Sequence, residues 1–330
     1  MREQLPSEES RALQDLSAAL GQEIPIVEHA GVDGIGAALS DGHVVALNIS
    51  TRKLAELPPS IAAFSHLEHL DFENNDVAVL PDSLFELRRL QTLVCARNRI
   101  SILPERIGEL TELRALALKG NGLRALPDTI ARLTRLRTLD LDNNQLESLP
   151  VAFGGLSALE DLNLGANRLS TAKEGAGGGL GFKNMGLTTL PPREALGGVE
   201  IIEELPETLL ELQAHLLGLT YNLLRELPES FGELRSLSRL SIMNNRLERL
   251  PASFGRLSSL KSAHLRANKL TELPASFAGL SALEELDLRD NRFVAAPNLA
   301  QLPRLHRLRL EGNPLPPTPS QTAADQPRRS

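Results

Sequence analysis

A pattern of apolar and polar positions recurs along most of this chain every 23 residues. Each copy reads apolar-x-x-apolar-x-apolar-x-x-Asn-x-apolar, as at Leu136, Leu139, Leu141, Asn144 and Leu146. Eleven copies share this order, the first starting at Val44 and the last at Leu305. Because self-similarity at a fixed period of this length is typical of stacked repeat architectures, the pattern predicts a solenoid.

Each copy changes from a strand-like to a helix-like spacing. Its fourth and sixth positions are apolar and alternate with polar residues, which predicts a short strand whose apolar side chains point inward. In eight copies a Leu-Pro pair follows, and apolar residues then recur at helical spacing, as at Leu149, Phe153 and Leu156. We expect the proline at the first position of a helical turn, where its missing N–H group costs nothing.

A single copy cannot bury its apolar side chains alone, so neighbouring copies must stack. Strands about 4.8 Å apart form one edge, and the helical segments need more room at the other, so the stack must curve. The predicted fold class is an α/β solenoid with parallel strands on the concave face and short helices or 3-10 turns on the convex face. The recurring asparagine carries donor and acceptor groups that can satisfy buried backbone groups at each turn. This structural ladder is predicted to comprise Asn75, Asn98, Asn121, Asn144, Asn167, Asn222, Asn245, Asn268, Asn291 and Asn313.

The full frame, LxxLxLxxNxLxxLPxxFGxLxxL, resembles the 23-residue leucine-rich repeats of intracellular proteins. Similar repeats occur in the Ras-suppressor family, plant intracellular Ras-group-related proteins, Erbin-type scaffolds and many bacterial proteins. The resemblance implies a leucine-rich repeat solenoid that acts as a cytoplasmic scaffold or regulator in signal transduction. By resemblance alone, a small GTPase or a phosphatase is a candidate partner. Family members share a platform rather than a target, so the partner itself stays open.

Residues 1–43 are predicted to cap the first repeat, since an exposed end layer would aggregate. Ser7 can N-cap a helix that runs from about Glu8 to Leu20, with Gly21 ending it. Asp41-Gly42 is a two-residue hairpin signal between two strand-like segments. The solenoid itself is expected to span residues 44–315, and residues 316–330 are expected to be a disordered tail.

The repeat loses its register over residues 170–213. Strand-like pairs at Leu180/Phe182 and Val199/Ile201 would allow two shortened repeats in this stretch, which is the interpretation we favour. The alternative is that one strand is absent and residues 192–213 form an outward helix. The glycine run in this stretch lacks the spacing of a phosphate-binding loop.

Outward strand positions of the concave face are where such a solenoid binds its partners. At the third, fifth and seventh positions, the six copies before the break carry five acids and one base. The five copies after it carry five bases and three acids. We therefore predict a partner of opposite polarity, with Tyr221, the only tyrosine, as an apolar anchor. The candidate protein-binding residues are Asp71, Glu73, Asp140, Asp142, Asp161, Tyr221, Arg239, His264, Arg266, Arg289, Arg307 and Arg309.

Composition narrows the remaining function classes. The single cysteine, Cys95, excludes a disulfide framework or a cysteine-based metal site, and its inward position predicts a core residue. A net charge of −7 argues against nucleic acid as the main ligand. No run of 18 uncharged apolar residues occurs, so we expect no membrane-spanning helix. No cofactor or metal is expected.

Two alternatives remain from other functional classes. A secreted bacterial effector or a sensor could use the same face on a host protein. A cation-binding or enzymatic site could also form at Asp140, Asp142 and Asp161, whose oxygens suit a hard cation such as calcium. We expect no enzyme activity, because the concave histidines lack a positioned nucleophile.

Overall fold

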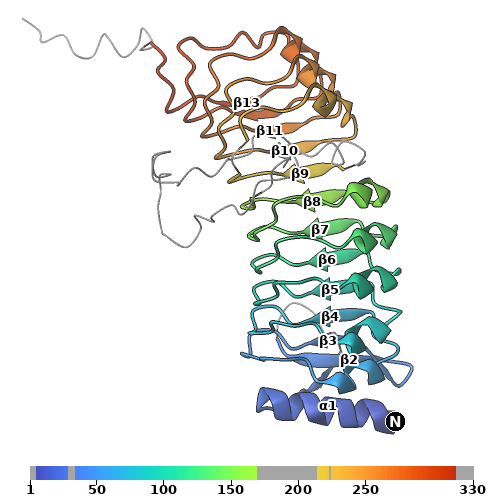
Figure 1. The fold of residues 1–330 in the computed structure, drawn as a ribbon. Helices are drawn as coiled ribbons and strands as arrows, with labels where there is room; N and C mark the ends of the chain where they lie inside the picture. Colours follow the sequence, from blue (N-terminus) through green and yellow to red (C-terminus); the bar gives the residue numbers. More distant parts are fainter. Residues whose placement is uncertain (1–4, 29–33, 169–213, 223, 317–330) are drawn as a thin grey trace, which may run out of the picture.

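The computed structural model describes residues 5–28, 34–168, 214–222 and 224–316. Over these residues the chain forms one thirteen-stranded sheet in which the strands follow chain order from β1 to β13. All neighbouring strands pair in parallel except β2 and β3, which form an antiparallel hairpin. Figure 1 shows the strands stacked above one another, with short helices along one side and α1 at one end. The predicted solenoid is therefore confirmed.

Ten repeat strands of three residues each form the body of the sheet. Neighbouring strands pair 23 residues apart over most of its length, as Leu116 pairs with Leu139. The middle residue of the strands from β4 to β12 is buried, and Leu139 is 1% exposed, whereas Leu308 in the last strand is 40% exposed. These strands are β4 (His69–Asp71), β5 (Thr92–Val94), β6 (Ala115–Ala117), β7 (Thr138–Asp140), β8 (Asp161–Asn163), β9 (Leu216–Gly218), β10 (Arg239–Ser241), β11 (Ser262–His264), β12 (Glu285–Asp287) and β13 (Arg307–Arg309).

The opposite side of the stack carries 3-10 helices of five residues each. The proline of each Leu-Pro pair stands at the N-cap rather than at the first helical position, so that detail of our prediction is wrong. In the first of these helices a second proline, Pro59, does take the first helical position. The proline carbonyl accepts the first helical hydrogen bond, as Pro150 O does from Phe153 N at 3.0 Å. The described helices are η1 (Pro59–Ala63), η2 (Asp82–Glu86), η3 (Glu105–Glu109), η4 (Asp128–Arg132), η5 (Val151–Gly155), η9 (Glu229–Glu233), η10 (Ala252–Arg256) and η11 (Ala275–Gly279).

The asparagine ladder forms as the sequence predicts. Asn144 Nδ2 donates to Leu118 O in the preceding layer at 2.9 Å and to Leu141 O in its own layer at 3.0 Å. Its Oδ1 accepts from Leu123 N at 3.1 Å. The same pattern reaches Asn313 in the last layer, where the amide contacts Leu288 O and Leu310 O. Each asparagine thus joins two consecutive layers through their backbones.

Leucine and phenylalanine side chains fill the interior between the strands and the 3-10 helices. Phe254 stacks between Phe231 and Phe277, with ring centroids 6.1 and 5.8 Å apart. Cys95 is fully buried, as expected for a core residue, and burial raises the pKa of its thiol well above the ordinary value. A protonated, buried thiol of this kind is unreactive.

The N-terminal cap consists of α1 (Ser7–Leu20), β1 (Ile26–Val27), β2 (Gly36–Ser40) and β3 (His43–Asn48). Ser7 is the first helical residue rather than the N-cap, because Pro6 takes the N-cap position and no side-chain cap bond forms. Gly21 ends the helix in the left-handed conformation, with φ of 67°. Asp41 and Gly42 both have positive φ, as a tight hairpin requires. Strand β3 also pairs with β4, so the cap and the first repeat share one strand.

The sheet continues directly across the irregular stretch of the sequence. Strand β8 pairs with β9, joining Leu162 to Leu217, and Asn222 Nδ2 donates to Leu164 O as the next member of the ladder. This direct pairing contradicts the prediction of two shortened repeats, because no place remains between β8 and β9 for another strand. The alternative helix over residues 192–213 and the tail at 317–330 lie outside the described residues.

Candidate protein-binding surface

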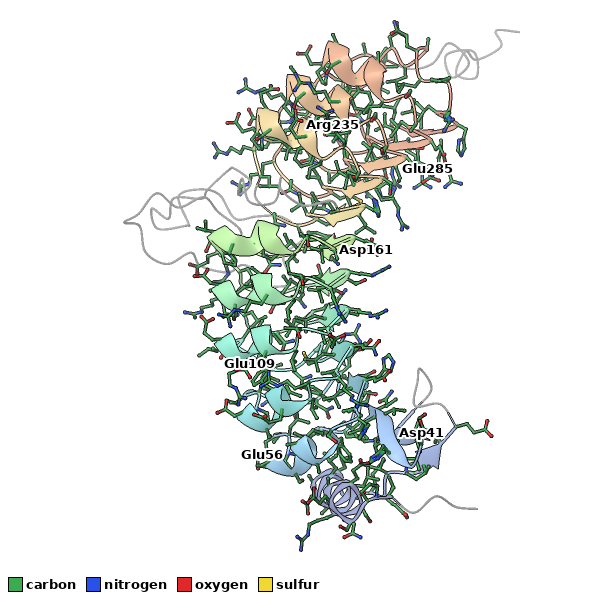
Figure 2. All side chains as sticks on the ribbon, turned by 90° about the vertical axis from the view of Figure 1, so that its right-hand side faces the viewer. Asp41, Glu56, Glu109, Asp161, Arg235 and Glu285 are labelled. Carbon is green, nitrogen blue, oxygen red and sulfur yellow. The ribbon has the colours of Figure 1, made fainter. Side chains whose placement is uncertain are left out.

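The strands form the concave face of the stack. Side chains at the same outward position of successive repeats form a row along this face. Figure 2 shows Asp161 and Glu285 on the strand side, whereas Glu109 and Arg235 lie on the side of the 3-10 helices. The alternation of a strand produces this arrangement, since the third and fifth positions point away from the buried fourth. The candidate residues therefore share one continuous surface, which we call the strand face.

Three acids in the N-terminal half of the strand face, Asp71, Asp140 and Asp161, form no ion pair within the described residues. Asp71 Oδ1 accepts a hydrogen bond from Glu73 N at 2.8 Å, and Asp140 Oδ1 accepts one from Asp142 N at 3.0 Å. Burial raises the pKa of both Asp71 and Asp140 above the ordinary value, and these backbone bonds offset only part of that effect. Their charges are therefore poorly solvated and available to an incoming cation.

The other two acids of this half have cationic partners on a neighbouring layer. Glu73 pairs with Arg97 on the next layer at 3.6 Å, and Asp142 pairs with Lys119 on the preceding layer at 3.1 Å. All four side chains are partly exposed, so each pair contributes little to stability. The pairs do neutralise these acids, which leaves Asp71, Asp140 and Asp161 as the main negative charges.

In the C-terminal half, acids on the same or neighbouring layers neutralise three of the predicted arginines. Arg266 pairs with Asp290 at 2.7 Å, and Arg307 pairs with Glu285 at 2.5 Å. Arg289 binds Asp287 through two nitrogens, with the closest contact at 2.6 Å.

The Asp287–Arg289 pair is the most enclosed of these. Burial alone would raise the pKa of Asp287, but the hydrogen bonds and charge of Arg289 outweigh it, and the pKa falls below the ordinary value. Asp287 is therefore ionised and committed to its arginine. Neither member of the pair is available to a partner without breaking these bonds.

Arg239 and Arg309 are the two predicted arginines that stay free on the described part of the strand face. Both side chains are exposed, and neither forms a hydrogen bond or an ion pair with a described residue. After ion pairing, the described part of the strand face keeps three unpaired acids before the break, and two unpaired arginines with one unpaired acid, Glu311, after it. The predicted polarity therefore depends on five residues, and Glu311 reduces it at the C-terminal end.

Two further candidates lie near the middle of the strand face. His264 Nε2 lies 3.2 Å from Ser262 Oγ. Tyr221 is 64% exposed, as we expected, and its φ of 56° is in the left-handed region. A residue other than glycine in this region costs about 1 kcal/mol, and the ladder geometry imposes that conformation on this position. The exposed phenol lies in the layer that follows the break.

The acids Asp140, Asp142 and Asp161 do not come together as a cation site. Among the described residues, the metal-ligating side chains that converge are Glu9, His43 and His66, at the cap. Sequence reasoning missed this cluster. The signal was present, because His43 and His66 are 23 residues apart and thus occupy the same position in consecutive layers.

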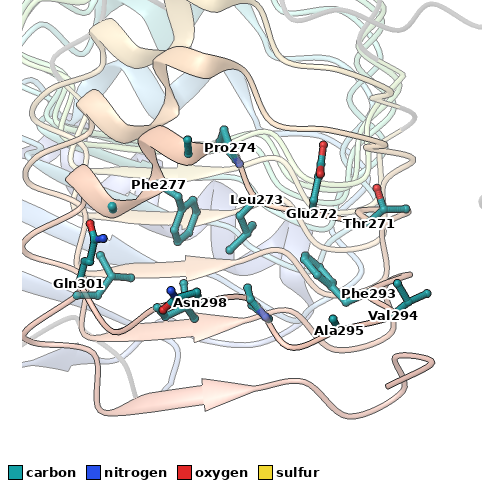
Figure 3. Close-up of a pocket in the computed structure, with 15 residues that line it drawn as sticks. Thr271, Glu272, Leu273, Pro274, Phe277, Phe293, Val294, Ala295, Asn298 and Gln301 are labelled. Carbon is teal, nitrogen blue, oxygen red and sulfur yellow. The ribbon is translucent and has the colours of Figure 1, made fainter. Parts of the chain in front are cut away.

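A separate cavity of about 380 Å³ opens between η11 and the chain that follows Phe293 (Figure 3). Leu273 and Phe277 line one wall, and Phe293 and Val294 line another. Within residues 224–316 no 3-10 helix connects β12 to β13, and the cavity takes the place of the missing helix. It lies away from the strand face and brings no candidate site residue together.

Family comparisons agree with this architecture. The strand–turn–3-10 layers and the asparagine ladder define a repeat solenoid. A family model described as "Leucine-rich repeat region" matches residues 202–321, and one described as "Leucine rich repeat" matches residues 111–169. The chain is a leucine-rich repeat protein. This fold is a typical non-catalytic protein-interaction fold. No curated protein matches the sequence.

Solved structures of other repeat proteins resemble it along most of its length. A leucine-rich repeat protein of Leptospira interrogans is 28% identical, with a TM-score of 0.51, over 84% of this chain and 80% of that one. A TDR receptor is also 28% identical, with a TM-score of 0.61, over 82% of this chain. The plant peptide hormone receptor RGFR1, solved in complex with RGF2, is 24% identical with a TM-score of 0.60. The chain spans only 44% of each receptor chain.

No helix in the described part of the chain is both long and apolar enough to cross a membrane. The one α-helix among the described residues, α1, has 14 residues and carries Glu8 and Glu9 in its first turn.

Proposed function

We propose that this protein is a non-catalytic platform that binds a protein partner on its strand face. The observation that carries the proposal is the separation of free charge along that face. Among the described residues, Asp71, Asp140 and Asp161 are free of ion pairs before the break. After the break Arg239 and Arg309 are free of them, and Glu311 is the one unpaired acid of that half in the same rows of the described strand face. A surface with two ends of opposite sign favours one orientation of an oppositely polarised partner and speeds its encounter.

The expected complex is of moderate affinity. Tight interfaces are usually anchored by Trp, Tyr and Arg, and this chain has no tryptophan and one tyrosine. Tyr221 and the two free arginines are therefore the expected anchors. A receptor with the same fold has been solved in complex with RGF2, which supports the capacity of such a solenoid to hold a ligand.

We further propose a cytoplasmic role as a scaffold or regulator in signal transduction. A small GTPase or a phosphatase is the partner class that the sequence resemblance suggests. The free, fully buried Cys95 supports a reducing compartment, because secreted domains usually carry disulfides.

The test first identifies a protein partner and then measures how reversing the charge of strand-face arginines changes its binding. Affinity capture with mass spectrometry supplies the partner, and titration calorimetry measures its dissociation constant. The double variant Arg239→Glu/Arg309→Glu should weaken binding about tenfold, equivalent to about 1.4 kcal/mol, at low salt. The loss should shrink as salt screens the reversed charges. These two arginines are better targets than Arg266 and Arg307, whose reversal would also break ion pairs.

A matched control separates a surface effect from a general charge effect. Arg235 is exposed on the side of the 3-10 helices, and its pair with Glu233 is exposed as well. Arg235→Glu should leave the affinity unchanged. Equal affinities for the double variant, the control and the unmodified protein would show that the strand face is not the binding surface.

A further inference from the structure

Three side chains from three separate segments converge at the N-terminal cap. Glu9 comes from α1, His43 begins β3, and His66 lies between η1 and β4. Glu9 Oε1 and His43 Nδ1 are 2.7 Å apart, and the two imidazole rings stack with centroids 3.8 Å apart. One ligand atom from each residue lies within 4.8 Å of the other two. These contacts join the cap helix, the hairpin and the first repeat at one point.

Glu9 is held in place by its surroundings. It is 2% exposed and lies on the buried face of α1 with Ala12, Leu13 and Leu16. Its Oε2 accepts a hydrogen bond from Val44 N at 2.8 Å, which leaves Oε1 directed at His43. A carboxylate buried this deeply needs a positive or donating partner, since burying an unpaired charge is costly. The backbone bond orients Glu9 in the way that an outer hydrogen bond orients a metal ligand.

The repeat itself brings the two histidines together. His43 and His66 are 23 residues apart, so successive layers place one ring on the other. Both rings are partly exposed and line a cavity of about 380 Å³, together with Asp41, Glu68 and Arg89. The two carboxylates offset the arginine charge. An ion can thus reach the rings from solvent and complete its coordination with water or with Glu68.

We propose that Glu9, His43 and His66 form a binding site for a divalent transition metal, with Zn²⁺ as the best match. Two imidazoles and one carboxylate suit zinc and its neighbours in the first transition row, whereas calcium and magnesium prefer oxygen ligands alone. An imidazole nitrogen binds a metal in the plane of its ring, so one of the two stacked rings must rotate before both can form bonds of about 2.0–2.2 Å to one ion. The bound ion would clamp α1 and the hairpin onto the first repeat.

The metal-free contacts account for only part of the cluster. The hydrogen bond between Glu9 and His43 satisfies the buried carboxylate without any ion. It gives no role to His66, whose other described contact is with the neighbouring Ser65 Oγ at 3.3 Å. A metal would engage both rings, and this difference makes His66 the residue to test.

The experiment is a zinc titration of the full chain without a histidine tag, after removal of metal with a chelator. Calorimetry should show one Zn²⁺ bound per chain, and Zn²⁺ should raise the unfolding midpoint by a few degrees. His66→Ala should weaken binding at least about tenfold and abolish the rise in midpoint. The control is His69→Ala, which removes an exposed histidine outside the cluster and should bind zinc like the unmodified protein.

Two outcomes would overturn the proposal. One is the absence of zinc binding by the unmodified protein, and the other is equal binding by His66→Ala and His69→Ala. If His66→Ala does not fold, Co²⁺ added to the unmodified protein decides the question. Coordination by two imidazoles and a carboxylate would give the strong visible absorption of a four-coordinate cobalt site, and a spectrum like that of aqueous cobalt would refute it.

Discussion

Replacing Asn144 with alanine should destabilise the protein far more than an ordinary surface substitution. Asn144 is 3% exposed and has repeat layers on both sides of it in the stack. Its side chain serves three backbone groups in two layers, the carbonyls of Leu118 and Leu141 and the N–H of Leu123. Alanine removes all three bonds and supplies nothing in their place.

The expected cost follows from the groups left behind. All three leucines are fully buried, so water has no ready access to the groups that lose their partner. An unsatisfied buried donor or acceptor costs about 1–3 kcal/mol. Three of them, reduced by local relaxation, predict a loss of about 3–5 kcal/mol in the free energy of unfolding. That loss is comparable with a large core truncation.

Urea unfolding followed by far-UV circular dichroism measures this loss, and Asn313→Ala is the matched control. Asn313 makes the equivalent bonds, to Leu288 O and Leu310 O at 2.8 Å and from Phe293 N at 3.0 Å. It lies in the last described layer and is only partly buried, so water can replace its side chain. We expect its removal to cost about 1 kcal/mol.

The comparison can refute the reasoning in two ways. Equal losses for the two alanine variants would mean that burial of the asparagine itself does not set the cost. A loss below about 1 kcal/mol for Asn144→Ala would mean that water reaches the ladder. Asn144→Asp tests the donor separately. It keeps an acceptor but directs a carboxylate oxygen at two carbonyls, so it should be at least as destabilising at pH 7 as alanine.

Two further predictions concern the core and the strand face. Phe254→Ala should cost about 3–5 kcal/mol in the urea assay, because the ring is fully buried between Phe231 and Phe277, whereas Phe254→Leu should cost less than half as much. The second concerns Asp140, whose pKa is raised by burial. The folded state therefore holds this proton more tightly than the unfolded chain, and the stabilising contribution falls as pH rises through the folded pKa. Asn163, at the same position in the next layer, accepts a backbone hydrogen bond through its Oδ1, so an asparagine at position 140 can keep the bond from Asp142 N. Asp140→Asn should therefore stabilise the protein by about 0.5 kcal/mol at pH 7 and have no effect at pH 3. A loss of stability at pH 7 would contradict this sign.

The fold was predictable because its determinants are local and repeated. An apolar residue at the fourth position must face inward in every layer, so the 23-residue period sets which residues pair, as Leu93 with Leu116. The asparagine ladder follows from the same period. The sequence did not place proline at the N-cap because its fixed φ suits both the N-cap and the first helical position. Only the hydrogen bond that the Pro150 carbonyl accepts distinguishes the two positions.

The candidate surface was harder to predict, because long charged side chains choose between several neighbours. Arg266 reaches Asp290 on the next layer, whereas Arg289 turns back to Asp287 on its own strand. Arg239 finds no acid among the described residues. The period places the charges on one face, but rotamers decide which of them cancel. Glu9 was missed for another reason, since nothing in the sequence distinguishes it from its neighbour Glu8 or places its carboxylate beside a histidine 34 residues away.

The break in the repeat adds chain without adding a layer. Asn167 and Asn222 are 55 residues apart, which is 32 more than one period of 23, yet β8 and β9 pair as consecutive layers. A copy of residues 145–158 placed in exchange for residues 168–213 restores the 23-residue spacing and supplies the usual Leu-Pro turn. Since the layers on both sides already stack directly, this variant should keep the circular dichroism spectrum and the unfolding free energy of the unmodified protein. A variant that unfolds or precipitates would show that the replaced residues support the stack, and that the direct pairing of β8 with β9 depends on them.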